Sequence, residues 1–253
     1  MYDFTPQKQM MRAALYLLNK HNLADVSALG GGTALAAYYW NHRYSTDIDI
    51  FTHSKQDISL LFRPSKWDNK FKNMMHAIGY KNYKMHPVYT EFVFEDDFKM
   101  QFLSVEDRTK NPYNKISLWD IDMLIESVEE IVAKKIYFRA HKGNARDLFD
   151  IAIAIHKDPA ILDKLIIPLE KIEELLQTLS TIHTEKKLFD EYLYEINLMN
   201  PNPAYKDIAD NTIEYLESFI ESYIGAKKLG IVLETSELFE IEKYSYSNII
   251  EKN

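Results

Sequence analysis

The sequence predicts an α+β fold, in which an N-terminal domain with a mixed central sheet flanked by helices precedes a C-terminal helical bundle. Two observations favour it. Strand and helix patterns alternate up to about Asn111-Pro112, and one amphipathic helix follows another beyond that point. Prolines separate the later helices. We therefore expect two domains, over residues 1–118 and 119–253, with a cleft between them.

The elements follow from hydrophobic periodicity and from turn residues. In the first domain we expect a helix over 6–21, a strand over 26–29, a helix over 33–40, a strand over 45–52, a helix over 55–77, and a hairpin of 89–95 with 98–104 around Asp96-Asp97. In the second domain we expect helices over 119–140, 145–157, 159–180, 184–199 and 203–228.

Composition narrows the function classes. The 253-residue chain has no cysteine, which excludes disulfides, zinc–thiolate sites and thiol catalysis. Its net charge of −8 is opposite to that of a dedicated nucleic-acid binder. Lysines among aromatic residues over 63–86 favour either a solvated surface or a face for polyphosphate or RNA. No apolar run is long enough to span a bilayer and no secretory signal is visible, so we expect no membrane partner and a cytoplasmic protein.

The stretch Gly30–Thr33 joins a predicted strand to a predicted helix. Glycines let the backbone approach a ligand closely, and the start of a helix attracts anions. Thr33 offers a hydroxyl, either as an N-cap or as a phosphate contact. The alternative is a tight turn that binds nothing.

Asp47 and Asp49 fall one residue apart on the strand expected over 45–52. Side chains alternate along a strand, so Ile48 and Ile50 should share one face and the two carboxylates the other. Two like charges so close repel unless a cation lies between them, and oxygen ligands of this kind suit Mg²⁺. The alternative is a solvent-facing strand end. Together with the glycine turn, the pair predicts metal-assisted nucleotidyl transfer.

The stretch GGTALAAYYWNHRYSTDIDIF resembles the signature of the DNA polymerase beta-like nucleotidyltransferase superfamily, a Gly-Gly-Ser/Thr turn followed by Asp-x-Asp. The piece His42-Arg43-x-Ser45-x-Asp47 resembles one branch, the AbiEii-type toxins of abortive-infection and toxin–antitoxin systems. A second block, SVEEIVAKKIYFRAHKGNARDLFDIAIAI, is similar to that family's Glu-Glu-x-x-Ala-x-Lys helix followed by Arg-Asp-x-x-Asp.

Lys135 is the notable residue of the second block. In the predicted 119–140 helix it lies on the same stripe as Leu124, Ile131 and Phe138, and burying an unpaired ammonium is costly. Either it lines a cleft and reaches a phosphate, or it extends to solvent; Lys134 is the less favoured candidate. Asn144 can N-cap the next helix with Asp147 as its capping-box partner.

The resemblance assigns roles residue by residue. It implies catalysis by Asp47, Asp49, Lys135 and Asp147, with Mg²⁺ or Mn²⁺ held by Asp47 and Asp49. It implies nucleotide binding by Gly31, Gly32, Thr33, Arg43, Ser45, Arg146 and Asp150. From the residues alone, Arg146 and Asp150 could simply pair with neighbours.

The sequence departs from the pattern in one respect. Nucleotidyltransferases of this kind usually take a third carboxylate from a later strand, and the best-aligned position in FKMQFLS holds Gln101. Glu91, Glu95 and Asp96 are the candidates to replace it.

The resemblance implies an enzyme that moves a nucleoside monophosphate from an NTP to an acceptor hydroxyl. It further implies toxicity, through an RNA acceptor such as tRNA, and a protein antitoxin as partner. One alternative is a nucleotide- or RNA-binding module on the same scaffold that has lost catalysis, which Gln101 motivates. Two others are an enzyme acting on small molecules, as antibiotic nucleotidyltransferases do, and a scaffold that binds no nucleotide.

Overall fold

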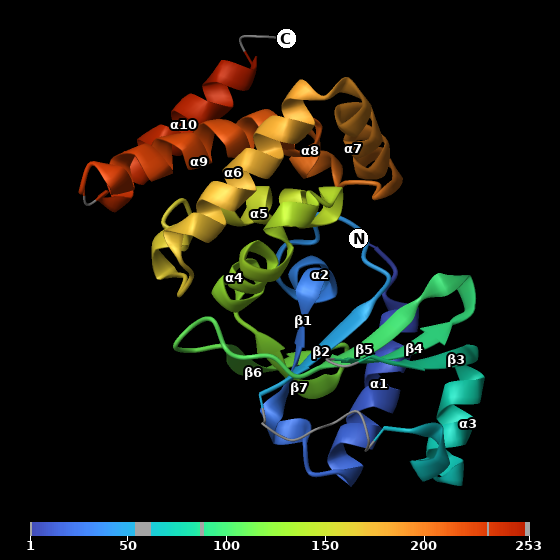
Figure 1. The fold of residues 1–253 in the computed structure, drawn as a ribbon. Helices are drawn as coiled ribbons and strands as arrows, with labels where there is room; N and C mark the ends of the chain where they lie inside the picture. The colour runs from blue at the N-terminus through green and yellow to red at the C-terminus, as the bar shows by residue number, and fades with distance from the viewer. Residues whose placement is uncertain (1, 54–61, 87–88, 232, 251–253) are drawn as a thin grey trace. The chain divides into compact units, whose positions relative to one another are not determined.

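The computed structural model of the protein describes residues 2–53, 62–86, 89–231 and 233–250. The chain divides into two compact units, Met1–Ser127 and Val128–Asn253 (Figure 1). The first unit contains a mixed β-sheet with flanking helices, and the second is built from helices. The predicted α+β class is therefore confirmed. Within the described residues, no helix combines the length and apolar character needed to cross a membrane.

Seven strands of the described chain form the sheet of the first unit, in the order β3-β4-β5-β2-β1-β7-β6. At its centre, β1 pairs antiparallel with β2 and parallel with β7, and β2 pairs parallel with β5. Antiparallel pairs complete both edges. The strands are β1 (Ser27–Gly30), β2 (Ile48–Thr52), β3 (Tyr80–Met85), β4 (Tyr89–Phe94), β5 (Lys99–Leu103), β6 (Tyr113–Leu118) and β7 (Ile121–Glu126).

The two faces of the sheet differ in polarity because successive side chains of a strand point to opposite faces. On one face Ile50 pairs with Leu29 and Phe102, and all three are fully buried. On the other face Asp49 pairs with Gly30 and Gln101. The predicted division of β2 into two faces is confirmed for Ile50 and Asp49, whereas Asp47, predicted to share the face of Asp49, lies before the strand.

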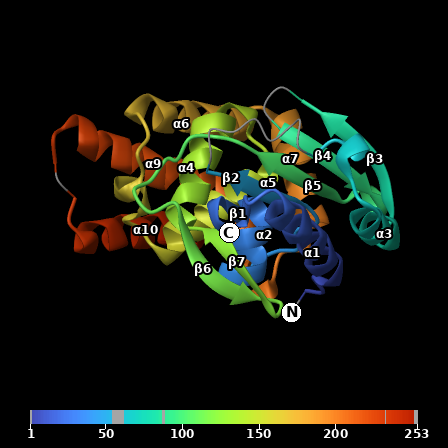
Figure 2. The ribbon, with the colours of Figure 1, turned by 90° about the horizontal axis from the view of Figure 1, so that it is seen from below.

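Among the described residues of the first unit, three α-helices accompany this sheet. Helix α1 (Thr5–Lys20) packs against β2 and α3 (Asn69–Ala77), and the two helices lie on one side of the sheet (Figures 1 and 2). Helix α2 (Gly31–Ala34) follows β1 directly and continues as a π-helical segment, Leu35–Trp40. The predicted second helix therefore exists but begins two residues before Thr33.

Two of the predicted elements need correction at their starts. The helix expected over 55–77 begins only at Asn69, because Asp68 caps it by accepting a hydrogen bond of 2.8 Å from the backbone N–H of Phe71; residues 54–61 of that segment lie outside the described residues. The strand expected over 45–52 begins at Ile48, so Asp47 precedes the strand.

The helix expected over 119–140 is wrong in its first part. Residues Ile121–Glu126 are β7, which forms a hairpin with β6. Trp119 and Asp120 make the two-residue turn, both with positive φ, as a tight hairpin requires. Helix α4 (Val128–Arg139) then starts after the strand, so Leu124 is not part of its apolar stripe. Strands β3 and β6 were not predicted either.

The second unit is helical throughout its described residues (Figure 1). Helix α9 lies at its centre, since α5, α6 and α10 all pack against it and its Tyr215 and Phe219 are fully buried. The prediction missed α10 and merged α8 with α9. The helices after α4 are α5 (Ala145–Lys157), α6 (Leu169–Thr184), α7 (Lys186–Leu198), α8 (Lys206–Asp210), α9 (Thr212–Lys228) and α10 (Thr235–Ile250).

Candidate active site

The three glycines between β1 and α2 each lie against a charged side chain. Gly31 has a positive φ of 63°, and a Cβ there would overlap Oδ2 of Asp49. A Cβ on Gly32 would overlap the guanidinium of Arg43, and one on Gly30 would overlap the carboxylate of Glu126. The glycines are therefore required because three charged groups approach the backbone of this turn.

Asp47 is held beside the turn by Thr33. The Thr33 hydroxyl is fully buried; it hydrogen-bonds to the backbone carbonyl of Asp47 and lies 2.8 Å from the Ser45 hydroxyl. The N-cap of α2 is Gly30, so the prediction that Thr33 could cap the helix is wrong. Its side chain instead fixes the segment that carries the first aspartate.

Gln7 of α1 supports the same segment, a role that no motif in the sequence indicates. Its Nε2 donates to the carbonyl of Ser45 at 2.8 Å and to that of Thr46 at 3.3 Å, and it lies 3.4 Å from the Tyr44 hydroxyl. A fully buried side chain thus fixes the backbone between Arg43 and Asp47.

Asp49 lies in a polar row that crosses the sheet. It pairs with Gln101 of β5, which pairs with Glu91 of β4, which in turn pairs with Lys84 of β3. Gln101 donates a hydrogen bond of 2.6 Å to Glu91, and Lys84 lies 3.2 Å from the same carboxylate. Burial opposes the charged form of Glu91, but the hydrogen bonds from Gln101 and Lys84 outweigh it and lower its pKa.

The register places Gln101, the position best aligned with the usual third carboxylate, immediately beside Asp49. Of the three carboxylates considered as replacements, only Glu91 contacts Gln101 in the described chain. Glu95 and Asp96 lie in the turn that joins β4 to β5, several residues from the row. The family pattern places a third carboxylate at the position of Gln101 on β5. Here the nearest described carboxylate on that side of Asp49 is Glu91, one strand further away on β4.

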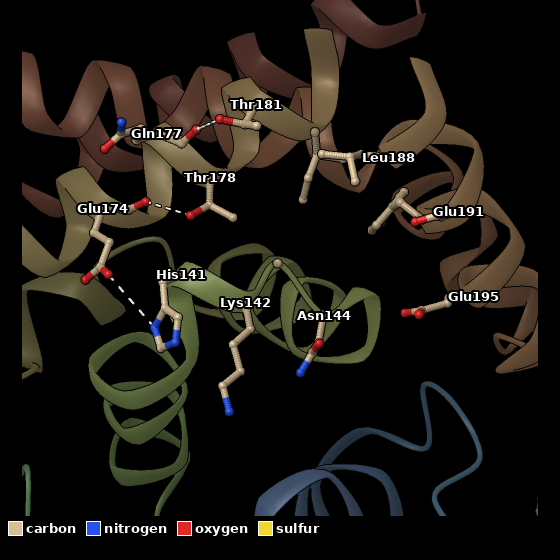
Figure 3. Close-up of a pocket in the computed structure, with 13 residues that line it drawn as sticks. His141, Lys142, Asn144, Glu174, Gln177, Thr178, Thr181, Leu188, Glu191 and Glu195 are labelled. Carbon is tan, nitrogen blue, oxygen red and sulfur yellow. Dashed lines mark hydrogen bonds and ion pairs between the residues drawn. The ribbon is translucent and has the colours of Figure 1, made fainter. Parts of the chain in front are cut away.

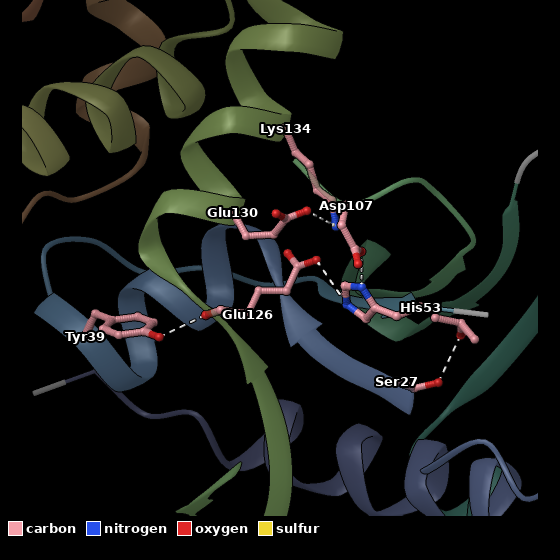
Figure 4. A network of polar contacts seen from close by, with 8 residues as sticks. Ser27, Tyr39, His53, Asp107, Glu126, Glu130 and Lys134 are labelled. Atoms are coloured by element: carbon pink, nitrogen blue, oxygen red, sulfur yellow. Dashed lines mark hydrogen bonds and ion pairs between the residues drawn. The ribbon is translucent and has the colours of Figure 1, made fainter. Parts of the chain in front are cut away.

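On the other side of the row, Glu126 ends β7, and its carboxylate lies against Gly30. Figure 4 shows this carboxylate pointing towards His53. Its carboxylate is 3.8 Å from Nε2 of His53, whose Nδ1 hydrogen-bonds to Asp107. The His53 ring also contacts that of Tyr113, with 4.6 Å between centroids. Sequence reasoning missed this cluster because it assigned Glu126 to a helix. Its only local signal was an acidic residue directly after the apolar run of residues 123–125.

The predicted residues of the second unit form a buried ionic cluster between α4 and α5. Lys135 lies 2.6 Å from Asp147 and 3.0 Å from Asp150, and Arg139 lies 2.9 Å from Asp147. The Lys135 side chain is 6% exposed, so it does not extend to solvent. Burial raises the pKa of Asp147, but the charges of Lys135 and Arg139 outweigh this and the pKa is lowered.

Two expectations about the start of α5 are corrected. Asn144 is the N-cap residue, but its side chain makes no capping hydrogen bond, because Asp147 pairs with Lys135 and Arg139 instead of forming a capping box. Arg146 is exposed at the surface of α5. The arginine that contacts the predicted aspartate is therefore Arg139, which the sequence analysis did not select.

The second unit also contains a cavity of about 440 Å³, bounded by the turn between α4 and α5 and by α6 and α7 (Figure 3). Its lining is mixed: His141 and Lys142 line one side, Glu191 and Glu195 of α7 line another, and Ile182 and Leu188 add apolar surface. None of the predicted site residues lines this cavity. It is therefore separate from the candidate active site.

The first unit offers Asp47 and Asp49 as oxygen donors for a divalent metal ion. Within the described residues no three His, Asp or Glu side chains form a ready metal site. Asp47 and Asp49 offer hard oxygen atoms, and Gly31 leaves a space that a Cβ would fill and that Asp49 occupies. Mg²⁺ commonly uses one or two carboxylates together with substrate phosphates, so the aspartate pair beside this turn fits such an ion.

The sheet, the glycine turn and the Asp-x-Asp strand define a nucleotidyltransferase. Residues 13–221 match the family described as nucleotidyl transferase AbiEii toxin, Type IV TA system, and the chain belongs to this family.

One solved structure agrees at the level of the fold. A candidate nucleotidyltransferase from H. pylori is similar with a TM-score of 0.52 and 19% identity, over 91% of this chain and 98% of that one. JHP933 from Helicobacter pylori is similar with a TM-score of 0.49 and 18% identity, over 97% of this chain and 96% of that one. A search of curated proteins found no significant match.

Proposed function

We propose that the protein is a Mg²⁺- or Mn²⁺-dependent enzyme that moves a nucleoside monophosphate from an NTP to an acceptor hydroxyl. The observation that carries this proposal is the contact between Asp49 and Gly31. A carboxylate suited to a metal ion lies against the backbone at the start of a helix, where N–H groups attract phosphate oxygens. A metal–triphosphate complex needs both kinds of group side by side.

The glycine turn would bind the phosphates through its backbone. Gly31 and Gly32 begin α2, whose first N–H groups have no partner within the helix. Arg43 lies against Gly32 and adds a positive charge to the turn. Thr33 and Ser45 would act indirectly, by holding Asp47 in place.

Asp47 and Asp49 would hold the metal ion, which when bound neutralises the phosphates and aligns them for attack. The acceptor oxygen forms a bond to the α-phosphorus, and the bond from that phosphorus to the oxygen bridging it to the β-phosphate breaks. The electron pair of the broken bond leaves with pyrophosphate, and the hydroxyl proton is released to water.

In the second unit we propose that Lys135 and Arg146 offset negative charge that develops on the phosphates. Asp147 and Asp150 would be positioning residues, because they fix the Lys135 ammonium from two sides. Two carboxylates and the cations Lys135 and Arg139 are close to balance in charge in this cluster. Loss of either aspartate should therefore change the position of the lysine as well as its charge environment.

The family description, a toxin of a type IV toxin–antitoxin system, supports a role as a toxin with a protein antitoxin as partner. We propose an RNA, such as tRNA, as the acceptor. The lysines of β3, which lies at the edge of the sheet two strands beyond β5, supply positive charge on that side of the row.

The test is a transfer assay with the purified protein. Wild type and the double variant Asp47→Asn, Asp49→Asn are incubated with total RNA, Mg²⁺ and each α-labelled NTP in turn. We expect labelled RNA with wild type only, and circular dichroism should show both proteins folded. Label transferred equally by the double variant would contradict the proposal. A thermal shift with Mg²⁺ and NTP but no transfer would instead indicate a binding module without catalysis.

A further inference from the structure

The row Asp49–Gln101–Glu91 suggests a role for Gln101 that rests on the proposed function. The strand order places β2 between β1, which carries the glycine turn, and β5, which carries Gln101. The attacking and leaving oxygens of phosphoryl transfer lie roughly in line, on opposite sides of the phosphorus. If the pyrophosphate is held at the glycine turn, the acceptor hydroxyl must arrive from the β5 side of Asp49.

Gln101 is the residue that faces this approach. It pairs directly with Asp49 on neighbouring strands, which lie about 4.8 Å apart. Its side chain is partly exposed, whereas the neighbours Met100 and Phe102 are fully buried on the other face. A molecule approaching Asp49 from β5 therefore meets the Gln101 amide first.

The orientation of that amide is fixed by Glu91. A carboxylate only accepts hydrogen bonds, so the NH₂ end of Gln101 must face Glu91, at 2.6 Å. Glu91 is 4% exposed and held by Lys84 at 3.2 Å. The lowered pKa of Glu91 agrees with a charged carboxylate that accepts these bonds. The carbonyl oxygen of Gln101 must then point away from Glu91, and it receives no hydrogen bond within the described part of the chain.

We propose that the Oε1 atom of Gln101 accepts a hydrogen bond from the attacking hydroxyl of the acceptor, and that Glu91 is the positioning residue that keeps Oε1 available. A neutral amide does not remove the proton, so the proton still leaves to water. Gln101 instead orients the hydroxyl oxygen towards the α-phosphorus. Its contribution is the correct placement of a reacting group.

The test compares variants in the transfer assay, with the NTP that wild type uses and total RNA as acceptor. Gln101→Met keeps the length of the side chain and removes the acceptor atom. We expect its transfer rate to fall about 10- to 100-fold, the loss typical of a misplaced reacting group, with the dissociation constant for Mg²⁺·NTP within about twofold of wild type. The transfer rate of Glu91→Gln should fall less. An amide at position 91 still hydrogen-bonds to Gln101, but it no longer dictates which end of the Gln101 amide faces position 91.

A reciprocal exchange separates chemistry from stability. Gln101→Glu alone places two carboxylates opposite each other and should lower both stability and transfer. The double variant Gln101→Glu, Glu91→Gln restores a hydrogen bond between the two positions and keeps an acceptor oxygen beside Asp49. We expect this exchange to recover most of the transfer rate. Gln177→Met, the same exchange at an exposed position on α6, is the matched control and should leave the rate unchanged.

The outcomes distinguish this inference from the proposed function. If the Asp47→Asn, Asp49→Asn protein is inactive while Gln101→Met transfers within about twofold of wild type, the role of Gln101 is wrong and the nucleotidyltransferase stands. The role of Gln101 is also wrong if Gln101→Met lowers the melting temperature but leaves the transfer rate unchanged. If the double aspartate variant transfers label as wild type does, the proposed function fails, and this inference fails with it.

Discussion

Asp49 and Gly31 are in such close contact that residue 31 has no room for a side chain. The contact joins the acidic strand β2 to the turn that begins α2. It shows that the glycine is required by a neighbouring carboxylate as well as by its own backbone conformation, with φ at 63°.

The first prediction concerns this contact. Gly31→Ala should destabilise the fold by about 1–2 kcal/mol through its left-handed backbone alone, and should also displace Asp49. We expect a lower melting temperature and a loss of the thermal shift with Mg²⁺ and NTP. Gly225→Ala is the control, because Gly225 lies in α9 with no atom near its Cβ position; it should be neutral or stabilise by up to about 1 kcal/mol. Equal behaviour of the two variants would contradict the prediction.

The second prediction concerns the ionic cluster of the second unit. Lys135→Met leaves Asp147 and Asp150 buried without their shared cation, which typically costs about 3–5 kcal/mol. Urea unfolding at neutral pH measures the loss. Lys187→Met removes a lysine of 87% exposure that pairs with Glu191, and it should change the unfolding free energy by less than about 0.5 kcal/mol. A Lys135 variant as stable as this control would show that the cluster contributes little.

The third prediction concerns pH. The charges around Asp147 lower its pKa in the folded protein below the ordinary value of 3.8. Its contribution to stability is therefore fully present above that value and is lost as the pH falls through the lower, folded pKa. Urea unfolding at several pH values between about 6 and 3 should show a smaller acid-induced loss for Asp147→Asn than for wild type. Parallel curves for the two proteins would rule out this contribution.

The fourth prediction concerns Gln7, which supports the backbone segment that precedes Asp47. Gln7→Met keeps the volume but removes the donor to the carbonyls of Ser45 and Thr46. We expect a loss of about 1–2 kcal/mol in the free energy of unfolding, and weaker binding of Mg²⁺ and NTP because Asp47 is less well fixed. Gln177→Met, an exposed change on α6, should alter neither quantity. Unchanged nucleotide binding in Gln7→Met would show that the segment between Arg43 and Asp47 keeps its position without Gln7.

The parts of the site that could be predicted are local in the sequence. The glycine turn and Asp47-x-Asp49 lie within about one helix and one strand of each other, and the chemistry of two adjacent carboxylates is evident from the residues alone. The approach of Gly32 to Arg43 and the buried role of Thr33 could not be predicted in the same way. They depend on how the chain returns to the turn after a π-helical segment.

The parts that escaped prediction depend on pairing between distant strands. Glu126 reaches Gly30 only because β7 lies beside β1, and the apolar pattern of β7 is also compatible with a helix. The contact of Glu91 with Gln101 depends on the register of β4 and β5. Lys135 was selected correctly as unusual, but its two carboxylate partners lie on the next helix, beyond the reach of periodicity.

The pleat of the sheet ties the assembly of the site to correct folding. Asp49 and Gln101 alternate with Ile50 and Phe102 along their strands. The polar row and the apolar core therefore lie on opposite faces of the sheet, and one register sets both. A slip of one residue between β2 and the rest of the sheet would turn Asp49 into the core and Ile50 out of it. A molecule misfolded in this way would bury a carboxylate in its core and would lose the contact between Asp49 and the glycine turn.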